Sequence, residues 1–184
     1  SSDKKKKRNK IVSRYQQFDG ANKIVDRVVD GTIKQGLIWH FQGSGKSFLM
    51  VFAAQKLRRH PLLKSPTIII LVDRVDLDTQ ISGTFAASKL PNTVRAESVR
   101  DLRKKLEDDR REVIISTVFK FNDLQDILIE RENIIVLIDE AHRSQEGKNA
   151  IEMKKVLPKA FYFGFTGTPI DRADKNTLDK IVIS

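Results

Sequence analysis

The residues with the clearest chemistry in this chain form a glycine-rich turn that ends in Gly-Lys-Ser. Its glycines permit backbone angles and close approaches that a Cβ atom would prevent. The backbone N–H groups of such a turn can surround a phosphate, a lysine amine can reach the outer phosphates, and a hydroxyl can bind Mg²⁺. The turn therefore predicts a nucleotide-phosphate and magnesium site formed by Gly43, Ser44, Gly45, Lys46 and Ser47.

The elements around this turn support the same interpretation. A short apolar run over Gly36–Trp39 predicts a buried strand, and apolar residues at helical spacing predict a helix over Lys46–Arg59. The full phosphate-loop pattern has a glycine where this chain has His40, and similar sequences also occur in polar loops that bind nothing. We favour the phosphate site because strand, loop and helix follow in the required order.

A second acidic signal follows the apolar run Ile134–Ile138, which leads directly into Asp139 and Glu140. A carboxylate at a strand end downstream of a Gly-Lys-Ser loop can hold the Mg²⁺ that Ser47 binds. We therefore expect Asp139 to bind the metal and Glu140 to orient and deprotonate the attacking water. The alternative is that the acidic pair only caps a following helix, but this does not explain why both motifs occur in this order.

A helix predicted over Ile11–Val29 carries adjacent glutamines, Gln16 and Gln17. A glutamine side chain offers the acceptor and donor that match the N6 and N7 edge of adenine. The alternative is a pair of solvated helix glutamines. The helix is weakest at Gly20, and we expect its buried face to include Ile11, Tyr15, Phe18, Ile24, Val25 and Val28.

Polar residues also follow the β-branched run Thr67–Val72, over residues 73–80. Open α/β sheets bind their ligands at the carboxyl ends of such strands, so Arg74 is a candidate phosphate contact. The acidic residues in this stretch could equally cap and charge the next helix. The sequence leaves both interpretations open.

Continuous apolar strands that alternate with helical stretches predict an α/β fold with a parallel sheet and helices on both faces. One of the intervening helices is predicted over Glu97–Arg111, with Val99, Leu102 and Leu106 facing the core. Because parallel strands end at the same edge, we expect the polar residues after them to share that edge. The five predicted strands are Gly36–Trp39, Thr67–Val72, Val113–Thr117, Ile134–Ile138 and Phe161–Phe165.

Composition indicates a single globular domain with its own core, because the 184 residues are 40% hydrophobic and 32% charged. No run resembles a membrane span or a signal segment, and the absence of cysteine excludes disulfides and agrees with a cytoplasmic protein. The net charge is +10, and half of it lies in residues 1–10, which we expect to be a disordered basic tail. The remaining charge over residues 11–184 suits a polyanionic partner.

Four stretches together resemble superfamily 2 helicases and translocases: Gln17, the loop over residues 43–47, Asp139-Glu140-Ala141-His142 and Thr166-Gly167-Thr168-Pro169. Four longer stretches are similar to the motor (restriction) subunit of type I restriction-modification enzymes, which are prokaryotic: Gly36–His40, Val72–Gln80, Asp139–Gln145 and Gly164–Pro169. In that family, as in this chain at His40, the first glycine of the phosphate-loop pattern is replaced. The resemblance extends from about Arg14 to Thr177 and implies a RecA-like phosphate-loop fold over residues 11–184, the first of two motor lobes.

The resemblance implies roles for further residues. Gln17 becomes the adenine reader, with Gln16 as the alternative. His142, Thr166 and Thr168 would couple ATP hydrolysis to movement on duplex DNA, and Arg74 and Thr117 would contact the DNA backbone. It also implies ATP and Mg²⁺ as cofactors, methyltransferase and specificity subunits as partners, and a second lobe and a nuclease domain elsewhere in the same subunit. Because the arginine finger belongs to the second lobe, we expect this chain alone to be a poor ATPase.

Two other functions fit the sequence. A different superfamily 2 motor, such as an RNA helicase, would use the same ATP chemistry on another track. A non-catalytic nucleic-acid or subunit-binding module could keep a vestigial phosphate loop, although intact Lys46, Ser47, Asp139 and Glu140 argue against this.

Overall fold

The computed structural model describes residues 14–39, 45–72, 75–124, 126–139, 152–167 and 180–182, with no side-chain description for residues 75–80 and 180–182. Seven strands form one sheet in the order β3-β4-β2-β5-β6-β1-β7, and every strand pair is parallel. The strands are β1 (Gln35–Trp39), β2 (Thr67–Val72), β3 (Thr93–Arg95), β4 (Val113–Thr117), β5 (Ile134–Ile138), β6 (Phe161–Thr166) and β7 (Lys180–Val182).

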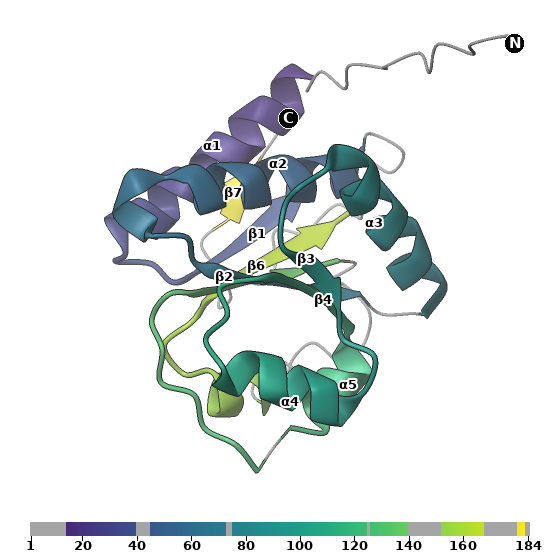
Figure 1. Ribbon diagram of the computed structural model, residues 1–184. Helices are drawn as coiled ribbons and strands as arrows, with labels where there is room; N and C mark the ends of the chain where they lie inside the picture. The colour runs from purple at the N-terminus through teal and green to yellow at the C-terminus, as the bar shows by residue number, and fades with distance from the viewer. Residues whose placement is uncertain are drawn as a thin grey trace, which may run out of the picture.

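Helices cover both faces of this sheet (Figure 1). On one face lie α1 (Tyr15–Asp30), α2 (Lys46–Arg59) and α3 (Val75–Ser88), whose apolar residues join one core cluster. On the other face, α4 (Val99–Glu107) and α5 (Val118–Asn122) join a second cluster together with a helical segment over residues 152–156. A 3₁₀ turn, η1 (Pro61–Leu63), follows α2.

The central strand β2 shows why the sheet needs cover on both sides. All six of its residues are buried. Ile68, Ile70 and Val72 pack into the cluster beneath α1 and α2, whereas Ile69 and Leu71 pack into the opposite cluster. Side chains alternate between the two faces of a strand, so an uninterrupted run of Ile, Leu and Val requires an apolar layer on each face.

The predicted parallel α/β sheet is confirmed, and all five predicted strands are present. The structure adds two edge strands, β3 and β7, which have only three residues each, and the five-residue helix α5. These elements are too short for a hydrophobic period to develop in the sequence. They form because each pairs with or packs on an element that is already in place.

Two helix predictions need correction. The helix expected over Glu97–Arg111 spans only Val99–Glu107, because the Ser98 hydroxyl caps its start by accepting from the Asp101 N–H and the backbone at Asp109 turns to positive φ. In α1, Tyr15 and Phe18 are 80% and 48% exposed, not buried as expected. They lie outside the α1 face that contacts the sheet, which carries Ala21, Ile24 and Val28; α1 also runs unbroken through Gly20. Ile11 lies outside the described residues.

At the edge of the sheet where the strands begin, arginine side chains donate hydrogen bonds to loop carbonyls. Arg58 donates to the Pro66 carbonyl at 3.2 Å and to the Arg111 carbonyl, while Arg131 donates to the Leu106 carbonyl at 2.9 Å. Burial, together with the nearby Arg111 charge, lowers the pKa of Arg58, but a guanidinium keeps its proton in proteins. These arginines hold loops in place, and the described residues of the predicted site lie at the other, carboxyl edge of the sheet.

No helix within the described ranges has the length and apolar character of a membrane span.

Candidate functional site

The two strongest sequence motifs meet through one ion pair. Lys46, the first residue of α2, places its ammonium nitrogen 3.0 Å from Oδ1 of Asp139, which follows β5. Both side chains are largely removed from solvent, with 16% exposure for Lys46 and 6% for Asp139. The backbone N–H of Asp139 also donates to the Leu71 carbonyl of β2 at 2.8 Å, which fixes the carboxylate at the sheet edge. The structure thus brings together a cation for phosphates and an oxygen ligand for a metal.

Gly45 sets the geometry of the turn before α2. Its φ is +90°, a left-handed conformation that strains any residue with a Cβ. A Cβ built on Gly45 would also lie 2.3 Å from Nε2 of Gln17. The Gly45 carbonyl accepts from the Leu49 N–H at 3.1 Å and begins the helix, so α2 points its positive N-terminal end at this turn. Ser47 stands in the first turn of the same helix, next to Lys46.

Gln17 is a buried residue that touches the turn. It is 5% exposed, so the alternative of a solvated glutamine is wrong for this residue, whereas Gln16 is only partly buried. Its Nε2 donates to the Gly45 carbonyl at 3.3 Å, and its Oε1 accepts from the Arg14 N–H at 3.0 Å. The first contact places an amide beside the predicted phosphate site. The second is a capping interaction at the start of α1, which is not evident from the sequence because Arg14 occupies the cap position.

Two other predicted site residues, Thr117 and Thr166, end strands at the same edge of the sheet. Thr117 ends β4, is 4% exposed, and its hydroxyl accepts from the Lys120 N–H at 3.4 Å as the cap of α5. Thr166 ends β6 beside Trp39 of β1 and is 1% exposed. Both positions match a shared carboxyl edge. The assigned roles of Thr117 in DNA contact and of Thr166 in coupling remain predictions.

Several predicted residues lie outside the described part of the chain, and their roles also remain predictions. They are Gly43, Ser44, Arg74, Glu140, His142 and Thr168.

The described residues fit a magnesium-nucleotide site. Mg²⁺ takes oxygen ligands, is commonly held by one or two carboxylates, and keeps other positions for water and substrate phosphates. Asp139 and the Ser47 hydroxyl offer that donor set next to the Lys46 ammonium. Among the residues with described side chains, no group of three or more His, Asp or Glu could hold a metal by itself. The site therefore suits a metal that arrives together with phosphates.

Comparisons with known proteins agree with this geometry. A family model described as SWI2/SNF2 ATPase matches residues 16–182. The HindI type I restriction enzyme endonuclease subunit of Haemophilus influenzae is 39% identical over 92% of this chain, and the alignment covers 19% of that protein. The MjaIXP protein of Methanocaldococcus jannaschii, named for the same kind of subunit, is 35% identical over 93% of this chain and 18% of its own length. The resemblance to type I restriction subunits is confirmed, and this chain spans about a fifth of these relatives.

Solved structures confirm the RecA-like fold. The Sulfolobus solfataricus SWI2/SNF2 ATPase core in complex with double-stranded DNA matches 89% of this chain and 34% of its own, with a TM-score of 0.68 and 18% identity. The UvsW helicase of bacteriophage T4 matches 87% of this chain and 54% of its own, with a TM-score of 0.60 and 19% identity.

The Lys46–Asp139 pair should stabilise the fold of the nucleotide-free chain. We expect Lys46→Met and Asp139→Asn each to lower the free energy of unfolding, because each leaves the other partner's charge poorly solvated. The double variant should lose less than the sum of the two, with a coupling energy of about 1–3 kcal/mol in urea unfolding followed by circular dichroism. If the losses of the two single variants add up to that of the double variant to within about 0.5 kcal/mol, a direct interaction is contradicted.

Proposed function

We propose a motor function for this chain, which belongs to the SWI2/SNF2 ATPase family: it is the ATP-binding lobe of a type I restriction subunit that couples ATP hydrolysis to translocation on duplex DNA. The observation that carries the proposal is the 3.0 Å contact between Lys46 and Asp139, which joins the phosphate-loop lysine to the acidic strand end. The assignment to a restriction system rests on the names of the relatives, and the chain corresponds to about a fifth of their length. Cleavage is assigned to a nuclease domain elsewhere in the longer polypeptide.

Each residue of the site has a role that follows from its chemistry. Lys46 neutralises charge on the outer phosphates of ATP, and binding replaces its contact with Asp139 by contacts with phosphate oxygens. Ser47 and Asp139 hold the Mg²⁺, which neutralises charge on the phosphates when bound. Glu140 takes the proton from the attacking water. Gln17 reads the adenine edge from its position beside Gly45.

The proposal places the DNA track on the carboxyl edge of the sheet. The strand β2, which Arg74 follows in the sequence, pairs with β4, which ends at Thr117, and we infer that both residues contact the DNA backbone where these two strands end. The solved neighbour bound to double-stranded DNA supports a duplex track for this fold. In the sheet, β5 and β6 lie between β2 and β1. Thr166 ends β6, and His142 and Thr168 follow β5 and β6 in the sequence, which supports a coupling role for these three residues.

The lobe alone lacks part of the proposed machinery. By resemblance, an arginine finger comes from a second lobe, and such a finger contributes ~10³ to 10⁵ in turnover at related sites. Nucleotide binding is therefore assigned to this chain, and efficient hydrolysis to the longer polypeptide. A vestigial phosphate loop would not need the buried Lys46–Asp139 pair, because two apolar residues of similar volume would often stabilise the fold as well or better.

Glu140→Gln in the longer polypeptide should separate binding from hydrolysis. The amide keeps the shape of the side chain but removes the base, so we expect ATP binding by calorimetry to persist while phosphate release and translocation are lost. The matched control is Glu130→Gln, a carboxylate with 65% side-chain exposure, which should leave turnover unchanged. Normal turnover in the Glu140 variant would assign the base to another residue.

DNA binding should be electrostatic and independent of sequence. Each neutralised phosphate releases counterions, so affinity for duplex DNA should fall with salt at a log-log slope of about −0.9 per phosphate contact. The test uses a chain that starts at Ile11, which lacks the basic residues 1–10, and compares it with its Arg74→Ala variant across a salt series.

The shortened chain should still bind, and Arg74→Ala should reduce the slope by about one contact for all sequences. Arg100→Ala, an exposed arginine on α4, is the matched control and should leave the slope unchanged. Loss of all binding with the tail, or an altered sequence preference in the Arg74 variant, would contradict the assigned track.

A further inference from the structure

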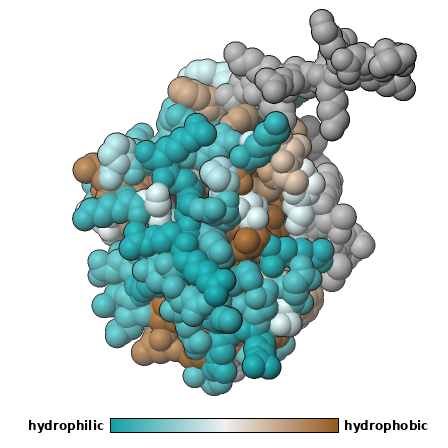
Figure 2. All heavy atoms as spheres, viewed as in Figure 1, coloured by the Kyte–Doolittle hydropathy of each residue, from teal (hydrophilic) through white to brown (hydrophobic). Residues whose placement is uncertain are grey.

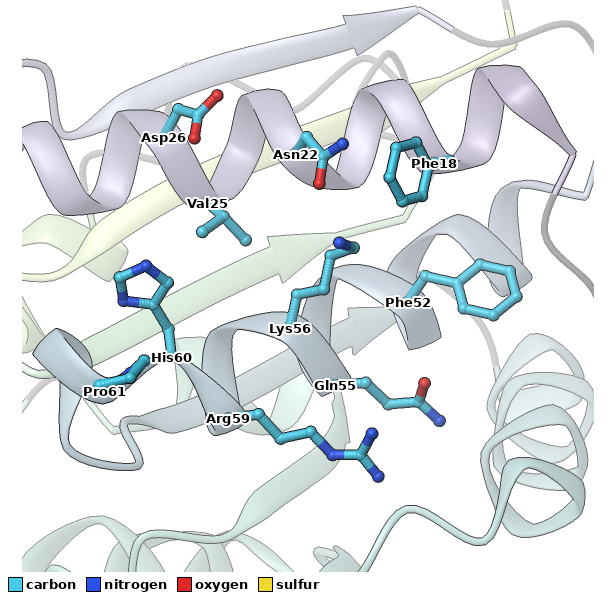
Figure 3. Close-up of a pocket in the computed structure, with 10 residues that line it drawn as sticks. All are labelled: Phe18, Asn22, Val25, Asp26, Phe52, Gln55, Lys56, Arg59, His60 and Pro61. Carbon is cyan, nitrogen blue, oxygen red and sulfur yellow. The ribbon is translucent and has the colours of Figure 1, made fainter.

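A groove lies between α1 and α2, on the outer side of the layer that covers the sheet (Figure 3). Its volume is about 590 Å³, which is within the range of ligand and peptide pockets. Its apolar wall is formed by Phe18 and Val25 of α1 and by Phe52 of α2. Asn22, Asp26, Gln55, Lys56, Arg59 and His60 supply its polar lining.

Two large aromatic side chains of α1 are exposed to solvent. The face in Figure 2 is largely hydrophilic, with small hydrophobic patches. Phe18, in contrast, is 48% exposed on a helix whose other apolar positions mostly face the core, and Tyr15, one turn earlier, is 80% exposed. Large aromatic groups contribute strongly to interfaces when they are covered. The outer side of α1 is therefore suited to contact another element.

Two cations border the groove without a carboxylate partner in the described part of the chain. The ammonium of Lys56 lies 4.6 Å from the centre of the Phe18 ring, and it points between the two helices (Figure 3). Arg59 lies one helical turn further along α2 and is exposed. Asp26 is the single acidic residue of the lining, and its side chain points away from Lys56. The groove thus combines an apolar floor with an excess of positive charge.

This groove is separate from the nucleotide site. Lys46 is the first residue of α2, whereas Lys56 lies ten positions later, about 15 Å along the helix axis at 1.5 Å per residue. The groove leads from Phe18 towards Pro61, near the carboxyl end of α2 and the amino edge of the sheet. A partner bound there would leave the phosphate-binding turn open.

We propose that the groove binds an acidic amphipathic helix contributed by the longer polypeptide of which this chain is a part. This rests on the proposed function, in which the chain is one lobe of a subunit about five times its length. Apolar side chains at i, i+3 or i+4, and i+7 of that helix contact Phe18, Val25 and Phe52. Its carboxylates pair with Lys56 and Arg59, neither of which forms an ion pair with another described residue.

Charge and shape argue against other occupants. The basic residues 1–10 precede α1 in the chain, but they have the same sign as Lys56 and Arg59. A nucleic acid would match the cations, but the Lys56 ammonium already covers one face of the Phe18 ring, and Val25 offers no polar contact to a phosphate or base. A second copy of this chain is tested below as an outcome.

The experiment measures amide hydrogen exchange of α1 and α2 in the 184-residue chain and in the longer polypeptide. We expect exchange over residues 15–30 and 46–59 to be at least ~10-fold slower in the longer polypeptide, because docking restricts local opening. The double substitution Lys56→Glu with Arg59→Glu should restore the faster exchange, since it places like charges against the docked carboxylates. The control, Arg100→Glu with Lys104→Glu, reverses two exposed cations on α4, on the other face of the sheet, and should keep the protection.

Four results would overturn the inference. The first is equal exchange in both chain lengths, and the second is protection that survives the Lys56 and Arg59 reversal. The third is a dimer of the 184-residue chain, seen by light scattering, which would assign the groove to a second copy. The fourth is a duplex DNA affinity that the reversal reduces more than the α4 control does, which would assign the groove to DNA. Mg-ATP binding is measured in every variant, so a failure of the groove with intact nucleotide binding leaves the proposed motor function standing.

Discussion

The parallel direction of the strands is the constraint on which the rest of this structure depends. It sends the ends of β1, β2, β4, β5 and β6 to one edge, although these ends are far apart in the sequence. The phosphate-loop turn after β1 and the acidic residue after β5 are separated by β6, a span of two strand spacings or about 10 Å. The long side chain of Lys46 bridges this distance, and its ammonium nitrogen lies 3.0 Å from the Asp139 carboxylate. A topology with either strand reversed would place these residues at opposite edges.

Much of this arrangement could be predicted from the sequence, because long apolar strands and a Gly-Lys-Ser turn are strong local signals. The boundaries of α2 and β2 agree with those predicted residue for residue. The edge strands β3 and β7 could not be predicted, since three residues carry no period and their pairing depends on β4 and β1. The exposure of Phe18 was also missed, because periodicity shows that a helix has an apolar face but does not show how wide the buried part is.

The site was predicted in its residue types, whereas its contacts required the fold. Sequence order suggested that Lys46 and Asp139 act together, but only the sheet order explains how they touch. The link between Gln17 and the Gly45 carbonyl was not predicted, because the two residues belong to different helices and the contact depends on how α1 packs beside α2. The same packing creates the groove around Lys56. In the function proposed above, the same helix pair would bind the nucleotide near its Gly45 end and the docked helix further along.

The central claim is that this chain binds a magnesium nucleotide through the turn before α2. The most direct measurement is calorimetric titration of the 184-residue chain and its Lys46→Ala variant with Mg-ATP, with Lys104→Ala as a control at an exposed lysine of α4. We expect weak binding by the unaltered chain and by the control, and none by the Lys46 variant, since this lysine is the cation that the described turn offers to phosphates. Equal affinity in all three proteins would contradict it.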